Sequence, residues 1–167
     1  MTVNKYLTDT KKVAAALVFI SLGTLSFVLF TQYGLGLRPC VLCVYQRIPY
    51  VVIIALGLLA YGLPKKAPCL IFLAAMTLLV EAGIAGFHIG VEQHWWEGTA
   101  HCSGKLPGAG ASIEELRAAI MSAPITRCDQ VTAQFLGVSM ATYNFFYSLT
   151  LAGLTFTAWR KSNGKKA

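Results

Sequence analysis

Uncharged, largely apolar stretches alternate with short polar segments along this chain. Residues 13–37, 48–64 and 130–159 contain no charged side chain, and residues 67–90 contain one, Glu81. A bilayer core of about 30 Å is crossed by roughly 20 apolar residues in a helix. The pattern therefore predicts four membrane-spanning helices.

The predicted fold is an all-α membrane protein, an antiparallel four-transmembrane-helix bundle that forms one integral membrane domain over residues 1–167. The expected spans are approximately 13–33, 47–64, 67–90 and 137–159, and the expected outer loops are approximately 34–46 and 91–136. The first span has a basic leader like that of a signal peptide. It is too long for one, and no small-residue cleavage site follows it, so we expect a retained helix.

Composition agrees with a membrane protein. Apolar residues make up 56% of the chain and charged residues 13%, with a mean hydropathy of +0.60, which excludes a disordered or fibrous chain. The net charge is +7, but the basic residues are not interleaved with aromatic residues on a polar face, so we expect no nucleic-acid partner.

The distribution of basic residues predicts the orientation in the membrane. Nine of the 14 Lys and Arg residues lie in the terminal segments and the 65–66 turn, which predicts that both termini are cytoplasmic.

The start of the second span is the least regular part of this pattern. Proline is tolerated in the first turn of a helix but bends a helix that begins earlier. Because of Pro49, the span begins either near Ile48 or earlier, with a bend.

The long outer loop contains one helix signal. Ser112 is suited to the N-cap, Glu115 completes a capping box, and Pro124 ends the segment. An apolar stripe at helical spacing begins at Ile113 and continues through Leu116 and Ile120. These features predict a short amphipathic helix that lies either on the bilayer surface or against the ends of the spans.

Five cysteines occupy positions 40, 43, 69, 102 and 128. In the predicted topology all except Cys69 lie on the outer side, in an oxidising compartment where disulfides persist. They form a tight pair, Cys40 and Cys43, and a looser pair, Cys102 and Cys128. This grouping suggests two disulfides.

Three interpretations of the tight pair were compared. A zinc site would need two further ligands, and the looser pair lacks the usual spacing, although His94 and His101 are nearby. A structural disulfide across so small a loop would stabilise the fold only weakly. A redox-active pair fits best, because CxxC thiols commonly exchange disulfides, although the βαβ pattern of a soluble thioredoxin is missing.

Arg47 favours the redox interpretation. It follows Cys43 by four residues, so in a continuous helix the guanidinium and the sulfur would share a face. A neighbouring cation favours the thiolate, which is the attacking form of cysteine. Away from a CxxC pair, the same arginine would be interpreted as an anchor at the membrane edge.

The segment Arg-Pro-Cys-Val-Leu-Cys-Val-Tyr-Gln-Arg (38–47), between the first two spans, resembles the DsbB/DsbI family of membrane disulfide-generating, quinone-reducing oxidoreductases. The stretch Phe-His-Ile-Gly-Val-Glu-Gln-His-Trp-Trp (87–96) resembles the same family. The resemblance extends to the four spans and to the second cysteine pair in the long outer loop. It departs at Gln46, where some members carry an acid.

The resemblance implies a multi-pass protein of the bacterial inner membrane with its active cysteines on the periplasmic side. A DsbA-like thioredoxin-fold protein would be reoxidised by the Cys102–Cys128 disulfide, with Cys102 as the attacked sulfur. Electrons would then pass to Cys40–Cys43 and on to a membrane quinone, either ubiquinone or menaquinone. Cys40 would exchange with the loop pair and Cys43 would face the quinone.

The resemblance also implies roles for two other side chains. Arg47 would stabilise the Cys43 thiolate and the negative charge that develops on the quinone. His88 lies close to the position of a histidine in the family's quinone pocket; the alternative is an interfacial histidine bonded to a backbone carbonyl. Glu92 and Gln93 are weaker candidates.

Two further residues have no place in this electron path. Glu81 lies within a span, where an acid indicates a functional site by default, with Thr77, Ser148 and Tyr143 as candidate partners. Cys69 is expected to be an inert free thiol.

Two other functions compete with a DsbB-like enzyme. A vitamin K epoxide reductase-like protein also combines a helical bundle, a CxxC and a quinone, but its CxxC lies late in the chain, whereas here it precedes the second span. A non-enzymatic membrane scaffold held by two disulfides would keep both pairs oxidised under all conditions.

Overall fold

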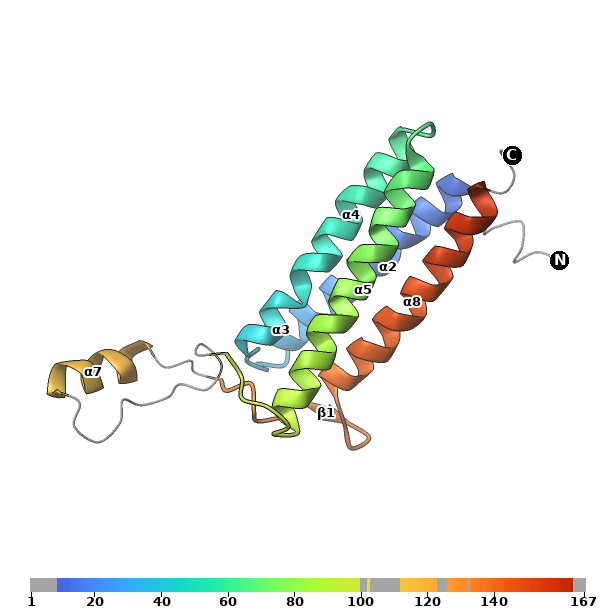
Figure 1. The fold of residues 1–167 in the computed structure, drawn as a ribbon. Coiled ribbons are helices and arrows are strands. Elements are labelled where there is room, and N and C mark those ends of the chain that lie inside the picture. Colours follow the sequence, from blue (N-terminus) through green and yellow to red (C-terminus); the bar gives the residue numbers. More distant parts are fainter. Residues whose placement is uncertain (1–8, 100–101, 103–111, 123–125, 132, 164–167) are drawn as a thin grey trace.

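A computed structural model describes residues 9–99, 102, 112–122, 126–131 and 133–163, which are mostly helical (Figure 1). In chain order the elements are α2 (Thr10–Tyr33), α3 (Val41–Tyr45), α4 (Arg47–Gly62), α5 (Ala67–Glu92), α7 (Ile113–Ser122), β1 (Gln134–Phe135), β2 (Val138–Ser139) and α8 (Met140–Asn163).

Three helical segments in the described part of the chain are long and apolar enough to cross a membrane: α2, α3 together with α4, and α5. They agree with the first three predicted spans. The fourth predicted span corresponds to α8, which has 24 residues but does not belong to this apolar set. Polar side chains such as Asn144, Ser148 and Thr155 make it less apolar, so its place in the membrane remains a prediction.

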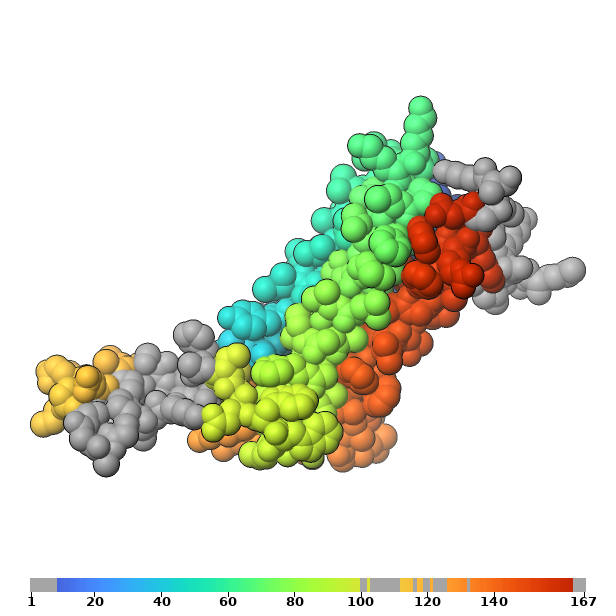
Figure 2. Space-filling model, viewed as in Figure 1, coloured from blue at the N-terminus to red at the C-terminus, as the bar shows by residue number. Residues whose placement is uncertain are grey.

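The long helices pack around α5, which contacts α4 on one side and α8 on the other (Figure 2). Helix α2 packs on α4. Small side chains form the buried face of α8, including Ser148 at 0% and Ala152 at 3% exposure. At the contact of α2 with α4, a Cβ on Gly57 would lie 2.6 Å from the Val18 side chain. Small residues let membrane helices approach this closely.

The second span begins in two pieces. The short α3 is followed by Gln46 and then by α4, whose first turn contains Pro49. Proline has no N–H to bond the carbonyl of Tyr45, so the helical hydrogen-bond ladder is broken there. Both sequence-based alternatives are therefore partly correct: helix precedes Pro49, and α4 proper starts at Arg47.

The two ends of the helices differ. The start of α2, the turn after α4 and the end of α8 lie at one end, and α3 lies at the other (Figure 1). At the same end as α3, a hairpin beside α8 pairs Phe135 with Val138 (Figure 1). Its two-residue turn, Leu136–Gly137, has positive φ at both positions, which is the geometry that hairpins of this length favour.

The capping box of α7 is confirmed. The Glu115 backbone N–H donates to Ser112 Oγ over 3.2 Å, and Glu115 Oε2 accepts from the Ser112 backbone N–H over 2.8 Å. Ile113 is exposed. Pro124 and the side chains of Leu116 and Ile120 lie outside the described residues, so both placements of the apolar stripe stay open.

Candidate active site: two cysteine pairs beside a cavity

Cys40 and Cys43 share the first turn of α3. Cys40 is the N-cap residue, and the Cys43 backbone N–H donates to its sulfur over 3.3 Å. The two sulfur atoms are 3.0 Å apart, within hydrogen-bond distance of each other. Cys40 is buried and Cys43 is half-buried. The spacing of three residues thus places both sulfur atoms on one side of a helical turn, within reach of each other.

These hydrogen bonds favour the thiolate of Cys40. The bond from the Cys43 thiol lowers the pKa of Cys40 to about 4 in spite of its burial, and a hydrogen bond with His88 adds to this effect. An ordinary cysteine has a pKa of about 8.5. At neutral pH, Cys40 is therefore the nucleophilic member of the pair.

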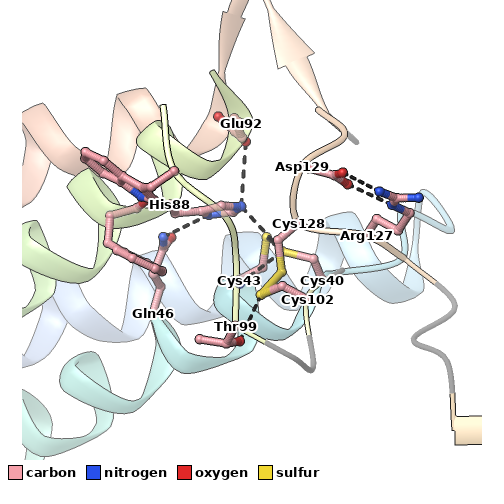
Figure 3. The surroundings of a disulfide bond; sticks show 12 residues. Cys40, Cys43, Gln46, His88, Glu92, Thr99, Cys102, Arg127, Cys128 and Asp129 are labelled. Atoms are coloured by element: carbon pink, nitrogen blue, oxygen red, sulfur yellow. Dashed lines mark hydrogen bonds and ion pairs between the residues drawn. A yellow bond between two sulfur atoms is a disulfide. The ribbon is translucent and has the colours of Figure 1, made fainter. Parts of the chain in front are cut away.

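His88 lies in the last turns of α5 and faces the CxxC (Figure 3). Its Nε2 is 3.5 Å from the Cys40 sulfur and 3.7 Å from Glu92 Oε1, and its Nδ1 is 3.1 Å from Gln46 Nε2. Because an amide NH₂ can only donate, Nδ1 accepts this bond and the ring proton is on Nε2. His88 is thus a hydrogen-bond donor to the Cys40 thiolate, not an interfacial residue bonded to a backbone carbonyl.

The loop cysteines form a disulfide that lies against the CxxC (Figure 3). Cys102 and Cys128, 26 positions apart, are bonded with their Cα atoms 5.0 Å apart. Both belong to one buried apolar cluster with Cys40, Leu42 and Val91. The structure therefore brings together the two pairs that the sequence places far apart.

One glycine allows the loop to carry this disulfide. A Cβ on Gly98 would lie 2.8 Å from the Cβ of Cys102, a distance that forces a shift. The Cys102 backbone N–H donates to Thr99 O over 2.7 Å, and the Thr99 hydroxyl lies 3.4 Å from the Cys102 sulfur. Gly98 and Thr99 therefore help to position Cys102.

Arg47 does not contact Cys43 as the sequence suggested. Its Nη1 donates to Gln32 Oε1 on α2 over 2.6 Å, and among the described residues no hydrogen bond or ion pair joins it to Cys43. The Arg47 guanidinium is instead bonded to α2, and Cys43 and Arg47 belong to the successive helices α3 and α4. The donor to a thiolate is instead His88, and that thiolate is Cys40.

Arg47 and Cys43 nevertheless line the same cavity, of about 540 Å³, between α2, α4, α5 and α8. Its wall is largely apolar, from side chains of α2 such as Phe27 and Val28. Polar groups gather where it meets α3 and the end of α5, among them His88 and Asn144. An apolar chamber with a few convergent polar groups is typical of a small-molecule site.

A polar network that the sequence did not predict runs through the helix core. Asn144 Nδ2 donates to Glu81 Oε1 and, over 3.1 Å, to Gln46 Oε1. The Tyr50 hydroxyl donates to Asn144 Oδ1 over 2.6 Å and lies 3.0 Å from Ser148 Oγ. The partner of Glu81 is thus Asn144, and Ser148 is one step away.

The other expected partners of Glu81 bond elsewhere. The hydroxyl of Thr77 donates to the carbonyl of Leu73, and that of Tyr143 donates to the carbonyl of Phe135. A helical amide such as Asn144 carries no chemical signature in sequence, and only its position on α8 brings it to Glu81. No signal in the sequence identifies it.

The sulfur atoms of Cys40 and Cys43 and a ring nitrogen of His88 lie within 4.8 Å of one another, close enough to hold a metal ion. A metal would require a free lone pair on His88 Nε2, but the bond from Gln46 to Nδ1 places the ring proton there. The hydrogen bonds therefore disfavour a zinc site at this position. Of the other ligands considered for zinc, His94 is exposed and His101 lies outside the described residues.

The remaining candidate residues lie in different places relative to the site. Glu92 is buried beside His88, and its Oε2 has no hydrogen-bond partner in the described part of the chain. Gln93 is exposed at the end of α5, and Cys69 is exposed at its beginning. Of these residues, only Glu92 lies at the site.

The chain is similar to several curated proteins. A family model described as "Disulfide bond formation protein DsbB" matches residues 10–158. An uncharacterized protein, RP370, of Rickettsia prowazekii is 32% identical over 154 residues, covering 90% of this chain and 89% of that protein. Proteins named "Disulfide bond formation protein B" from Xylella fastidiosa and Chromobacterium violaceum are each 30% identical, over 86% and 82% of this chain and 86% and 84% of their own lengths. No solved structure matches the chain.

Proposed function

Since the chain belongs to the DsbB family, which makes it a disulfide-forming membrane oxidoreductase, we propose that it reoxidises a periplasmic DsbA-like thioredoxin-fold protein and passes the electrons to a membrane quinone. The observation that carries this proposal is the gathering of both cysteine pairs at one end of the helices, beside a chamber lined by Cys43 and Arg47.

The first step uses the loop disulfide. A thiolate of the reduced partner attacks Cys102, which forms a mixed disulfide and releases Cys128 as a thiolate. The second partner thiol then attacks its own mixed-disulfide sulfur and releases Cys102. The partner leaves as a disulfide, and the loop pair holds two electrons and two protons as a dithiol.

The second step moves these electrons to the CxxC pair in its disulfide form. A thiolate of the loop pair attacks Cys40, and resolution by the other loop cysteine restores the Cys102–Cys128 bond and leaves Cys40 and Cys43 reduced. Packing of both pairs in one buried cluster supports this exchange. The described structure has the arrangement expected after it, with the loop pair bonded and the CxxC pair free.

The chamber fits a quinone. Its apolar wall suits an isoprenoid tail, and Arg47, His88 and Asn144 line it where a polar ring would sit. The Cys40/Cys43 dithiol would give two electrons and two protons to a quinone held there by these residues and would return to the disulfide. Arg47, whose charge is permanent and whose Nη1 is already held by Gln32, would donate hydrogen bonds to a ring oxygen.

We also propose that α8 is a fourth membrane span and that the α3 end of the helices is periplasmic. Some polar residues of α8 are turned inward, with Ser148 at 0% and Thr155 at 4% exposure, whereas Phe146 is 61% exposed. Lys and Arg residues collect at the opposite end, in the first turn of α2, the turn after α4 and the last turn of α8. Such clusters are typical of cytoplasmic ends, so both termini would be cytoplasmic.

Quinone reduction by the purified protein tests the function. We expect a reduced thioredoxin-fold dithiol protein to drive bleaching of a short-chain ubiquinone, with one partner disulfide formed per quinol. The Cys43→Ser variant should support none. A protein whose two cysteine pairs both stay oxidised in the presence of excess reduced partner would instead be a disulfide-stabilised scaffold.

A further inference from the structure

Glu81 is a buried acid that the proposed electron path does not use. It is 0% exposed, deep within α5, and its Oε2 has no hydrogen-bond partner among the described residues. Burying a carboxylate is unfavourable unless hydrogen bonds compensate for the lost water. Its only described hydrogen bond runs to Asn144 on α8. Burying an apolar residue at this position would cost less free energy, so the presence of an acid here requires a functional explanation.

The contact with Glu81 sets the orientation of the Asn144 amide. A carboxylate only accepts hydrogen bonds, so it must face the NH₂ of Asn144 rather than its oxygen. The second hydrogen of the same NH₂ reaches Gln46 Oε1, and the Tyr50 hydroxyl donates to Asn144 Oδ1. If the Asn144 amide were rotated by 180°, its oxygen would face Glu81 Oε1 and Gln46 Oε1, which are both hydrogen-bond acceptors. Glu81 and Tyr50 thus hold Asn144 in one orientation.

The orientation passes along the chain of hydrogen bonds to the active site. Because Gln46 accepts at Oε1, its NH₂ faces Nδ1 of His88, and that nitrogen must accept. The ring proton is then on Nε2, which faces the Cys40 sulfur at 3.5 Å and Glu92 Oε1 at 3.7 Å. Both of these groups accept hydrogen bonds when charged. Every link from α5 through α8 and the α3–α4 junction is therefore consistent with a single arrangement of protons.

We propose that Glu81 is a positioning residue, which acts through Asn144 and Gln46 to keep the proton of His88 on Nε2, facing the Cys40 thiolate. Without Glu81, Asn144 and Gln46 could both reverse. The His88 proton could then move to Nδ1, which would leave a lone pair of Nε2 against the sulfur. The inference rests on the proposed function only in assigning Cys40 as the exchanging thiolate.

The tautomer of His88 can be measured directly by nitrogen NMR on reduced protein labelled with ¹⁵N-histidine, without partner or quinone. The chain has three histidines, and the His88→Gln spectrum assigns the signals. We expect the unaltered protein to carry the proton on Nε2. In Glu81→Leu the share with the proton on Nδ1 should rise about tenfold, the factor that one lost hydrogen-bond preference gives.

Three companion variants make the result specific. Asn144→Leu breaks the next link and should give the same rise, and it decides the question if Glu81→Leu does not fold. Glu81→Gln keeps an acceptor oxygen for Asn144 and should stay close to the unaltered protein. Thr77→Val removes a polar group from the same helix that bonds only to the Leu73 carbonyl in the described structure, and it should change nothing.

The proposal is overturned if Glu81→Leu, or Asn144→Leu in its place, keeps the tautomer of the unaltered protein, or if Thr77→Val shifts it equally. A second measurement, the rate at which reduced Cys40 attacks a small aromatic disulfide at pH 7, should fall about tenfold in Glu81→Leu. Failure of quinone reduction in unaltered protein would refute the proposed function without affecting these results. If the unaltered protein reduces quinone but the Glu81→Leu variant keeps the same His88 tautomer, only this inference is refuted.

Discussion

Cys40 and Cys43 lie within one helical turn among hydrogen-bonding side chains, whereas Cys102 and Cys128 are 26 residues apart and are held by their own disulfide and by apolar packing. The first pair has a thiolate with a pKa lowered to about 4 and a histidine donor beside it. The second pair lies next to the surface ion pair of Arg127 with Asp129. The comparison shows that neighbouring side chains tune the CxxC, whereas the loop pair is held by its own bond and by apolar burial; in the proposed pathway the loop pair would exchange with the partner.

Removing one cysteine from each pair should have the largest effect and should break the pathway at different points. Both Cys40→Ser and Cys102→Ser should abolish electron transfer from the partner to quinone. In a single turnover, Cys40→Ser should still oxidise one equivalent of reduced partner through the loop pair, and Cys102→Ser should oxidise none. Cys69→Ser, which alters an exposed thiol at the far end of α5, is the control and should behave as the unaltered protein does.

Blocking resolution should identify the sulfur that the partner attacks. In Cys128→Ser, the free Cys102 thiolate should attack the disulfide of the oxidised partner and release one partner thiol, and the mixed disulfide should accumulate because no Cys128 remains to resolve it. Non-reducing electrophoresis followed by peptide mapping measures this. A trapped species that requires Cys40 would mean that the partner bypasses the loop pair.

Changing Arg47 should affect the quinone step and leave the loop pair untouched. A buried charge-assisted hydrogen bond contributes roughly 1.5–3 kcal/mol, so Arg47→Ala should raise the quinone concentration for half-maximal rate about tenfold to a hundredfold. Arg47→Lys keeps the charge but not the planar fork, and its effect should be intermediate. Slow partner oxidation with an unchanged quinone dependence would instead assign Arg47 to the membrane edge.

The smallest effect should be on pH dependence, where Cys40 should differ from an ordinary thiol. With a pKa of about 4, Cys40 stays a thiolate from pH 8 to pH 5, so its alkylation rate should change little. A thiol with a pKa of about 8.5 loses reactivity roughly tenfold per pH unit over that range. Mass spectrometry of the Cys40 peptide measures the rate, and a tenfold fall per unit would contradict the hydrogen-bonded thiolate.

The lowered pKa also gives the sign of a redox effect. A thiolate held below its usual pKa stabilises the reduced, folded pair fully above the ordinary value of 9.0, and this stabilisation is lost as the pH falls through about 4. At equilibrium with a dithiol of ordinary pKa such as dithiothreitol, the CxxC disulfide should therefore become harder to reduce as the solution is acidified toward pH 4.

The apolar pattern was enough to predict the three apolar helices, because membrane crossing imposes length and charge limits on the sequence itself. The cysteine pairs were also predictable, since a CxxC has a fixed spacing and Cys102 and Cys128 were the remaining outer thiols. The capping box of α7 was predictable as well, because its partners Ser112 and Glu115 are only three residues apart.

What could not be predicted depends on contacts between helices. The bond of Arg47 to Gln32 joins α4 to α2, and that of Glu81 to Asn144 joins α5 to α8. Neither pair has a spacing that the sequence encodes. The interruption at Gln46 was foreseeable from Pro49, but the bond of the Arg47 guanidinium to Gln32 rather than to Cys43 required the structure.

The central claim, that the CxxC pair delivers electrons to a quinone, can be tested without the loop pair. In a Cys69→Ser, Cys102→Ser, Cys128→Ser variant, Cys40 and Cys43 are reduced with dithiothreitol, the reductant is removed under anaerobic conditions, and one equivalent of short-chain ubiquinone is added. The prediction is one quinol formed for every two thiols lost, with a disulfide between Cys40 and Cys43. Persistence of both thiols beside unreduced quinone, in protein that still binds the quinone, would contradict it.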